Sequence, residues 1–416
     1  MFFRTLGVAL ALALIPASAR ATEKRAVPDY DGAGAQKAPK AAEGALWVPR
    51  VALFPLWLVS EYVVRGPIRG LVSVFDHNAG EGSGARDRWD VRPIMVFDYG
   101  FRPRLGAMVT GNHALTLWRI RADTFGRSSY ALGAAVATEI GKSTVEVMSE
   151  ISRRPDTIFH GFGPSSTPDA RVRVPMDRGQ TAVKLTAEPH PSFLVTTAIA
   201  VRGASFRVPV ERDYVALAQR LGVVLDLRPL REVGISVPVE LQRASGVRID
   251  LDGELATAPL PARRWMSYGG TVLGMLDVYR GRMLEVSATA RFVDPLKKSE
   301  DPPYVEQVTL GGDRYLRGHL AGRLVGRSAL VAAVTYRWPV WVFLDGVISV
   351  EAGNVFNEHL RDASPKLFRL SATAGVRNTG QSGYLLELLG GIGTETIADG
   401  ARISSVRVLF SASRNL

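Results

Sequence analysis

From about residue 91 to the C-terminus, the chain consists of short segments in which apolar and polar residues alternate. Residues 284–292 place Leu, Val, Ala and Phe at even positions and Glu, Ser, Thr and Arg at odd positions; residues 247–255 and 406–410 show similar alternation. A period of two residues predicts β-strands whose two faces meet different surroundings. Such strands build either a soluble sandwich, with polar side chains facing water, or a transmembrane barrel, with apolar side chains facing lipid.

The alternating segments predict an all-β fold with about sixteen antiparallel strands, each long enough to cross a membrane when tilted. Turn-forming residues separate the segments. The expected strands are 91–100, 104–113, 129–141, 143–159, 178–188, 192–203, 213–228, 246–258, 265–279, 282–293, 304–310, 327–341, 344–356, 367–378, 383–396 and 402–413.

The N-terminus has the features of a secretory signal peptide. Arg4 precedes the apolar stretch Leu6–Ile15, and Ala19 and Ala21 supply small residues at a cleavage site. The apolar stretch is too short for a membrane-spanning helix. We therefore expect residues 1–21 to direct export and to be removed.

The residues that follow the signal peptide predict two further segments. Residues 22–46 are rich in Ala, Gly, Lys and Pro without apolar periodicity, which predicts a disordered tether. Residues 47–90 read as an amphipathic helical segment and a linker. One helix starts at Pro67, and its apolar residues recur at helical spacing: Ile68, Leu71, Val72 and Phe75. We expect a helical hairpin at the periplasmic mouth of a barrel formed by residues 91–416.

The composition of the chain limits its possible disulfides, its possible metal and catalytic sites, and the charge of its partners. The chain has no cysteine, so an exported protein of this sequence has no disulfides. Its six histidines lack metal-ligand spacing, and no Gly-x-Ser-x-Gly motif is present, so we expect no metal, no cofactor and no catalytic site. The net charge of +11 favours anionic lipid and lipopolysaccharide as partners, and not nucleic acid. An arginine-rich genome explains this charge equally well.

Three motifs near the C-terminus narrow the fold further. Residues 310–319 read Leu-Gly-Gly-Asp-Arg-Tyr-Leu-Arg-Gly-His, residues 335–339 read Thr-Tyr-Arg-Trp-Pro, and residues 350–356 read Val-Glu-Ala-Gly-Asn-Val-Phe. Glycines allow a backbone that doubles back, and an arginine offers five donors in a rigid fork for carboxylates. In this order, the motifs resemble the C-terminal barrel of the BamA/TamA outer-membrane assembly family, also called the bacterial surface antigen family.

The resemblance implies a transmembrane barrel in the bacterial outer membrane and a long loop that folds into its lumen. The loop arginine of the family meets acidic residues on the next two strands. The predicted latch here comprises Gly311, Gly312, Arg317, Gly318, Glu351 and Gly353. Thr335 replaces the first acid, which leaves Arg337 without an obvious partner, and His319 replaces the usual aromatic residue. These departures predict a weaker latch than in the family.

Two further segments carry a fainter resemblance. Residues 159–166, Phe-His-Gly-Phe-Gly-Pro-Ser-Ser, resemble a glycine-rich segment that follows the fourth strand in the family, although an ordinary loop with a solvated His160 explains them almost as well. Asp226 and Arg228 face the same side of one strand, and we expect them to form an ion pair in the lumen. Arg248 and Arg337 are further predicted lumen charges.

The resemblance implies a short relative, without periplasmic repeat domains, that acts in membrane protein assembly: insertion or transport of protein or lipid at the outer membrane. Its partners would then include unfolded outer-membrane proteins or a periplasmic protein. The family mechanism implies a weakly paired seam between the first and last strands. The alternative is a passive, anion-favouring pore or structural barrel, lined by Arg248, Arg291, Arg337 and Lys184. A membrane-embedded lipid enzyme is a weaker alternative, because no catalytic set is recognisable.

Overall fold

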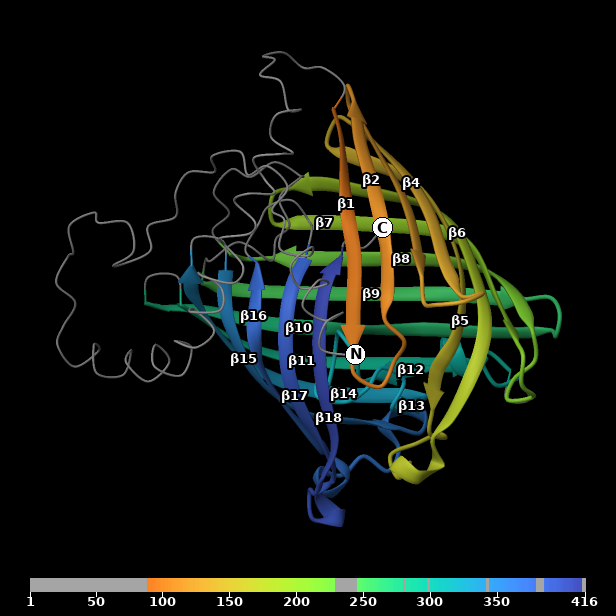
Figure 1. The fold of residues 1–416 in the computed structure, drawn as a ribbon, viewed down its shortest axis with the longest axis vertical. Helices are drawn as coiled ribbons and strands as arrows, with labels where there is room; N and C mark the ends of the chain where they lie inside the picture. The colour runs from red at the N-terminus through yellow and green to blue at the C-terminus, as the bar shows by residue number, and fades with distance from the viewer. Residues whose placement is uncertain are drawn as a thin grey trace. The chain divides into compact units, whose positions relative to one another are not determined.

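The computed structural model describes residues 88–228, 245–279, 282–297, 300–341, 344–378 and 385–413. In this part of the chain, sixteen antiparallel strands close into a barrel, which confirms the predicted fold class (Figure 1). The described residues contain no helix that is long and apolar enough to cross a membrane. The predicted signal peptide, tether and helical segment lie outside the described residues, except that residues 88–90 already belong to the first strand.

The barrel strands follow one another around the wall in sequence order, and β1 closes on β18. Two short strands, β12 (Val308–Leu310) and β13 (Leu324–Gly326), form a separate sheet in the connection between β11 and β14. The barrel strands are β1 (Arg88–Asp98), β2 (Arg104–His113), β3 (Thr116–Thr124), β4 (Tyr130–Ile140), β5 (Ser143–Phe159), β6 (Val172–His190), β7 (Phe193–Phe206), β8 (Tyr214–Asp226), β9 (Gly246–Ala258), β10 (Arg263–Tyr279), β11 (Arg282–Pro295), β14 (Ser328–Trp341), β15 (Leu344–Phe356), β16 (Arg369–Asn378), β17 (Leu385–Thr396) and β18 (Ile403–Ser413).

The alternation along each strand separates an apolar outer face from a polar inner face. On β15, Ile348 and Val350 are 45% and 54% exposed, whereas Ser349 and Glu351 are each 4% exposed. Outward apolar residues recur on every side of the barrel, among them Leu132, Val147, Val183, Ile199, Leu221, Leu251, Val272, Val286, Val334 and Val406. Contact of this apolar belt with water is unfavourable, whereas contact with lipid hydrocarbon is favourable.

One predicted strand is wrong and one barrel strand was not predicted, so the predicted count of about sixteen still agrees with the structure. Residues 116–124 form β3, which the sequence analysis left unassigned although exposed Ile120 alternates there with buried Arg121 and Asp123. Residues 304–310 are not a barrel strand: Tyr304–Glu306 is a 3-10 turn and Val308–Leu310 is β12, both in the loop that follows β11. The barrel also begins at Arg88 and not at residue 91.

The connections differ in length between the two ends of the barrel. At the end where β1 leads into β2, they include residues 160–171, 296–327 and 357–368. At the opposite end, only two residues each join β2 to β3, β4 to β5 and β6 to β7, although the β8–β9 connection is long. Transmembrane barrels carry long loops on the outer side and short turns on the periplasmic side. We call residues 296–327 the lumen loop.

Candidate functional site

The lumen loop doubles back on itself at two adjacent glycines. Gly311 and Gly312 have φ angles of +96° and +89°, in the left-handed region that favours glycine. The backbone N–H of Gly311 donates to the carbonyl of Tyr315 at 2.9 Å, and that of Gly312 donates to the carbonyl of His319 at 2.9 Å. A Cβ atom at Gly311 would lie 2.2 Å from the carbonyl oxygen of Leu320. The turn therefore requires glycine.

Arg317 lies inside the barrel and contacts two strands. Its backbone N–H donates to Oε2 of Glu351 on β15 at 2.5 Å. Its guanidinium lies 2.8 Å from both carboxylate oxygens of Glu387 on β17. Arg317 and Glu351 are thus in contact, as the motif suggested, but through the backbone, and the charged partner is Glu387. Ser371 on β16 completes the group, since its hydroxyl donates to Glu351 and accepts from the N–H of Gly318.

The next two loop residues pack directly on β17. A Cβ atom at Gly318 would lie 2.0 Å from the carbonyl oxygen of Ile392, so only glycine allows this approach. The imidazole of His319 is fully buried, and a Cβ atom at Gly393 would lie 2.6 Å from it. Burial, together with the positive charge of Arg323, lowers the pKa of His319 to about 3. The ring is therefore neutral at physiological pH and acts as a packed aromatic group.

Arg407, on the last strand, joins the lumen loop to the first strand. Its Nε and Nη2 donate to the two carboxylate oxygens of Asp98 on β1 at 2.9 and 2.8 Å. Its Nη1 donates to the carbonyl of Gly312 at 2.6 Å and to that of Arg317 at 3.2 Å, and Nη2 also meets Asp313 at 2.7 Å. The side chain is 1% exposed. One guanidinium therefore bonds both strands of the seam and the loop.

A second arginine of the loop connects it to the β5–β6 connection. Arg323 donates to the hydroxyl and the carbonyl of Ser166, both at 2.9 Å, and lies 3.1 Å from Glu395 at the end of β17. Arg369 on β16 contacts the same Glu395 and donates to the carbonyl of Ser166 at 2.8 Å. The two guanidiniums share one carboxylate and one carbonyl, which holds this part of the loop to the barrel wall.

The glycine-rich segment 159–166 is a docking partner of the loop and not a free loop. The N–H of Gly163 donates to the carbonyl of Val325 on β13 at 2.9 Å, and the carbonyl of Pro164 accepts from Asn354 at 3.1 Å. The prediction of a solvated His160 is wrong, because its side chain is buried. Burial and nearby Arg323 lower the pKa of His160 to about 4. In this barrel the segment follows the fifth strand, β5, and not the fourth, because the barrel includes the unpredicted strand β3.

The beginning of the loop is anchored on the opposite wall through Glu306. Arg202 on β7 lies 2.6 Å from its carboxylate, and the hydroxyl of Tyr214 on β8 donates to it. The turn that carries Glu306 packs over an inner surface of small side chains on β6 to β9: Ala182, Ala200, Ala204, Ala216, Ala218, Ala256 and Ala258. The loop thus contacts inner walls contributed by widely separated strands.

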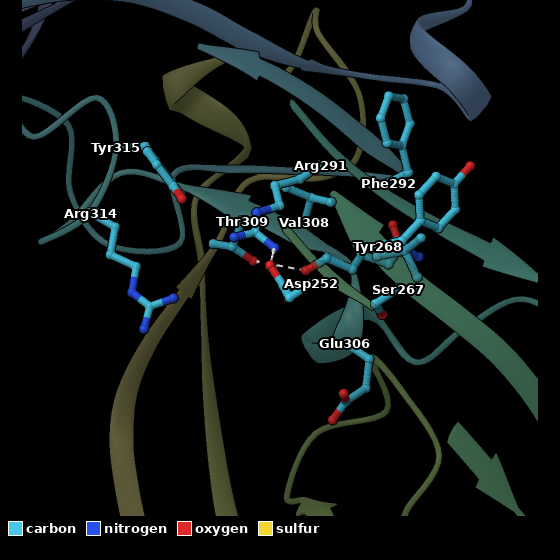
Figure 2. Close-up of a pocket in the computed structure, with 12 residues that line it drawn as sticks. Asp252, Ser267, Tyr268, Arg291, Phe292, Glu306, Val308, Thr309, Arg314 and Tyr315 are labelled. Carbon is cyan, nitrogen blue, oxygen red and sulfur yellow. Dashed lines mark hydrogen bonds and ion pairs between the residues drawn. The ribbon is translucent and has the colours of Figure 1, made fainter. Parts of the chain in front are cut away.

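Between the loop and the wall lies a cavity of about 280 Å³ with both polar and apolar walls. Figure 2 shows Arg291 of β11 directed at Asp252 of β9, with Arg314 and Tyr315 of the loop on one side and Tyr268 on the other. Apolar side chains of Phe292, Val293 and Val308 also line the cavity. In the described residues, no group of three or more His, Cys, Asp or Glu side chains could hold a metal ion.

The other predicted lumen charges are paired, but away from the latch. Nε of Arg228 lies 2.7 Å from Asp226, at the short-turn end of β8. Arg248 contacts Asp250 at 2.8 Å. Arg337, expected to have no obvious partner, lies 3.0 Å from Glu285.

Gly353 has a packing role on β15. A Cβ atom there would lie 2.4 Å from the carbonyl oxygen of Leu330 on β14, which requires glycine at this position.

Within the described residues, which end at Ser413, the β1–β18 seam has a short paired stretch. Met95–Asp98 pairs with Leu409–Ala412, whereas the register between β1 and β2 extends over nine residues, Arg88–Val96. β1 ends at Asp98, so the segment 403–407 of β18 continues beyond it (Figure 1). Arg407 stands where the pairing stops. The described part of the seam is therefore held by a short ladder and by this side chain.

The chain is similar to known proteins in structure and not in sequence. No family profile matches the chain, and no curated protein matches its sequence. Its structure is similar to BamA from Haemophilus ducreyi lacking POTRA domains 1–3, with a TM-score of 0.56 and 10% identity over 79% of this chain and 70% of that one. It is also similar to CdiB from Acinetobacter baumannii, with a TM-score of 0.50 and 12% identity over 77% of this chain and 59% of that one. The chain shares the barrel fold of these outer-membrane proteins.

Proposed function

We propose that this protein is a bacterial outer-membrane barrel that inserts or transports protein or lipid, as a short relative of the BamA/TamA family. Three observations support the proposal. The fold is similar to BamA and CdiB, the outward face of the barrel is apolar, and the arginine of the Gly-Gly…Arg-Gly motif meets the glutamate of the Glu-Ala-Gly-Asn motif inside the barrel. No step of such a role needs a catalytic group.

The contact made by Arg407 carries the mechanistic part of the proposal. Its guanidinium donates to Asp98 across the seam and to two carbonyls of the lumen loop. Because one guanidinium donates to both sets of acceptors, through Nε and Nη2 to the seam and through Nη1 to the loop, movement of the loop weakens the seam and opening of the seam loosens the loop. A seam that separates would expose strand edges, which can pair with an incoming strand. We propose unfolded outer-membrane proteins or a periplasmic protein as partners.

The lumen charges give little support to a passive anion pore. The four cations on which that alternative rested each contact a carboxylate. Arg248 meets Asp250, Arg291 meets Asp252, Arg337 meets Glu285, and Lys184 meets Glu146. Paired charges of opposite sign largely cancel the field that would select anions.

A disulfide across the seam tests the proposal. The chain has no cysteine, so the pair Val96→Cys and Ser411→Cys, which are opposite each other in the register, forms the only possible bond. The control pair, Val109→Cys and Ile120→Cys, joins β2 to β3 away from the seam. Liposomes that contain the barrel receive an unfolded outer-membrane protein, and its folding rate is measured.

The proposal expects the seam disulfide to remove the acceleration of folding, a reductant to restore it, and the control disulfide to have no effect. An unchanged rate in the oxidised seam variant would contradict a role for the seam. Planar-bilayer recordings distinguish the proposed function from the passive pore. Small, flickering conductance steps support a plugged assembly barrel, and large, steady, anion-selective conductance steps support a passive pore.

A further inference from the structure

Five arginines surround one cavity at the long-loop end of the barrel. The cavity, of about 330 Å³, is lined by Arg102, Arg127, Arg153, Arg154 and Arg207, together with Ser128, Ser129, Pro155 and Pro175. Arg102 follows β1, Arg127 lies in the β3–β4 turn, Arg153 and Arg154 are on β5, and Arg207 follows β7. The chain therefore gathers these cations from four separate hairpins. We call the cavity the arginine rim site.

The rim site has more positive than negative charge. Asp177 forms ion pairs with Arg153 at 2.9 Å and with Arg207 at 3.5 Å, and Asp156 lies 3.4 Å from Arg154. These two carboxylates leave three positive charges in excess. Within the described residues, neither Arg102 nor Arg127 forms an ion pair, and both are exposed. Their donors are thus available to an anion that enters the cavity.

Aromatic rings hold two of the guanidiniums in place. Arg154 lies over the ring of Phe125 at 4.6 Å, and Arg153 lies over the ring of Tyr130 at 5.7 Å. A planar guanidinium held in this way binds phosphate oxygens with several donors and loses little entropy on binding. The tetrahedral, doubly charged head of a phosphate monoester matches several guanidiniums that converge on one small cavity.

The position of the site favours a lipid as the molecule that bears the phosphate. Exposed apolar side chains lie along the same strands: Ile151 is two residues from Arg153 on β5, Leu132 is on β4, and Val201 is on β7, at 48%, 44% and 49% exposure. The site therefore borders the apolar belt, at the end whose long loops indicate the outer side. A lipid with a phosphorylated head would place its acyl chains on the belt and its phosphate among the arginines.

We propose that the arginine rim site binds the phosphorylated head group of a lipid of the outer leaflet, with the chemistry of lipopolysaccharide. The proposal rests on the proposed function in one respect, namely that the barrel spans the outer membrane. Binding at this site would fix the height of the barrel in the leaflet and would order lipid beside β3 to β7.

The test compares lipid binding by the purified full-length barrel and two variants. Arg102→Gln with Arg127→Gln removes the two unpaired cations of the site. Arg361→Gln with Lys366→Gln removes two exposed cations from the β15–β16 connection at the same end. Native mass spectrometry in detergent measures the affinity for diphosphoryl lipid A, for the same lipid after enzymatic dephosphorylation, and for inorganic phosphate.

We expect the rim variant to bind diphosphoryl lipid A about tenfold more weakly, the size of losing one or two charge-assisted hydrogen bonds, and the control variant to bind like wild type. Dephosphorylated lipid should bind about tenfold more weakly to wild type, and inorganic phosphate more weakly than lipid A. Equal binding by the rim variant, or equal binding of the dephosphorylated lipid, overturns the site. Inorganic phosphate bound as tightly as lipid A overturns the lipid as its ligand.

Insertion of each variant into liposomes, measured by its heat-modifiable migration, is recorded in parallel. A barrel that inserts but fails to bind lipid A contradicts only the rim site. A barrel that fails to insert contradicts the proposed function, whatever its binding in detergent.

Discussion

Separating Arg317 from Glu387 should weaken the attachment of the lumen loop to β17. The guanidinium lies 2.8 Å from both carboxylate oxygens, and the two side chains are 14% and 6% exposed. Unit charges about 4 Å apart attract by about 4 kcal/mol at an effective dielectric constant near 20. The free-energy cost of removing both charged groups from water offsets much of this attraction. We therefore expect a coupling energy of about 1–3 kcal/mol.

A double-mutant cycle measures this coupling. Arg317→Ala, Glu387→Gln and the double variant are unfolded in urea, and the folded fraction is followed by heat-modifiable migration. Each single change should lower the free energy of unfolding by about 1–3 kcal/mol, and the double variant should lose little more. Arg314→Ala, which removes an exposed cation of the same loop, is the control and should lose less than about 0.5 kcal/mol.

The two single changes also act on the pore. The N–H of Arg317 keeps its bond to Glu351 in Arg317→Ala, so the loop should loosen without leaving the lumen entirely. Larger and more frequent conductance steps are the expected result in planar bilayers. Additive losses of stability in the cycle, together with unchanged conductance, would refute the reasoning that this pair holds the loop.

Three further predictions concern the same loop. The pKa of His319 is about 3 in the folded protein and about 6.5 when unfolded, so the unfolded state binds more protons between these values. This histidine therefore costs about 2 kcal/mol of stability at pH 5. Urea titrations at pH 5 and 7.5 should show a loss that is about 2 kcal/mol smaller in His319→Phe than in wild type, because the loss that comes from His160 is common to both proteins. Gly318→Ala should destabilise the barrel by at least about 1–3 kcal/mol, because its Cβ meets backbone, whereas Gly253→Ala, with nothing within 4 Å, should cost less than about 1 kcal/mol in the same assay. Arg407→Gln should raise the frequency of large conductance steps, since the seam and the loop lose a common donor; steps like those of wild type would mean that the two move independently.

Local alternation was enough to predict strands with two unlike faces, because each strand carries its own apolar and polar sets. The choice of a barrel over a soluble sandwich came from the signal peptide, the absence of cysteine and the three motifs. The same rule could have found β3, where Ile120 faces outward and Arg121 inward. It failed at residues 304–310 for a physical reason. A loop segment packed across the lumen also buries apolar side chains beside polar ones: Val305 and Val308 pack on the wall, and Glu306 between them pairs with Arg202.

The turn of the lumen loop was predictable from its glycines, and the placement of Arg317 inside the barrel from its motif. The partners were not. Glu387 is 70 residues from Arg317, and Asp98 is 309 residues from Arg407. An inward carboxylate looks alike on any strand, since alternation states which face a residue occupies and nothing about its height or its neighbour around the wall. Those are decided when the strands pair in register and β18 closes on β1, which brings Asp98 of the first strand to the guanidinium of Arg407 on the last.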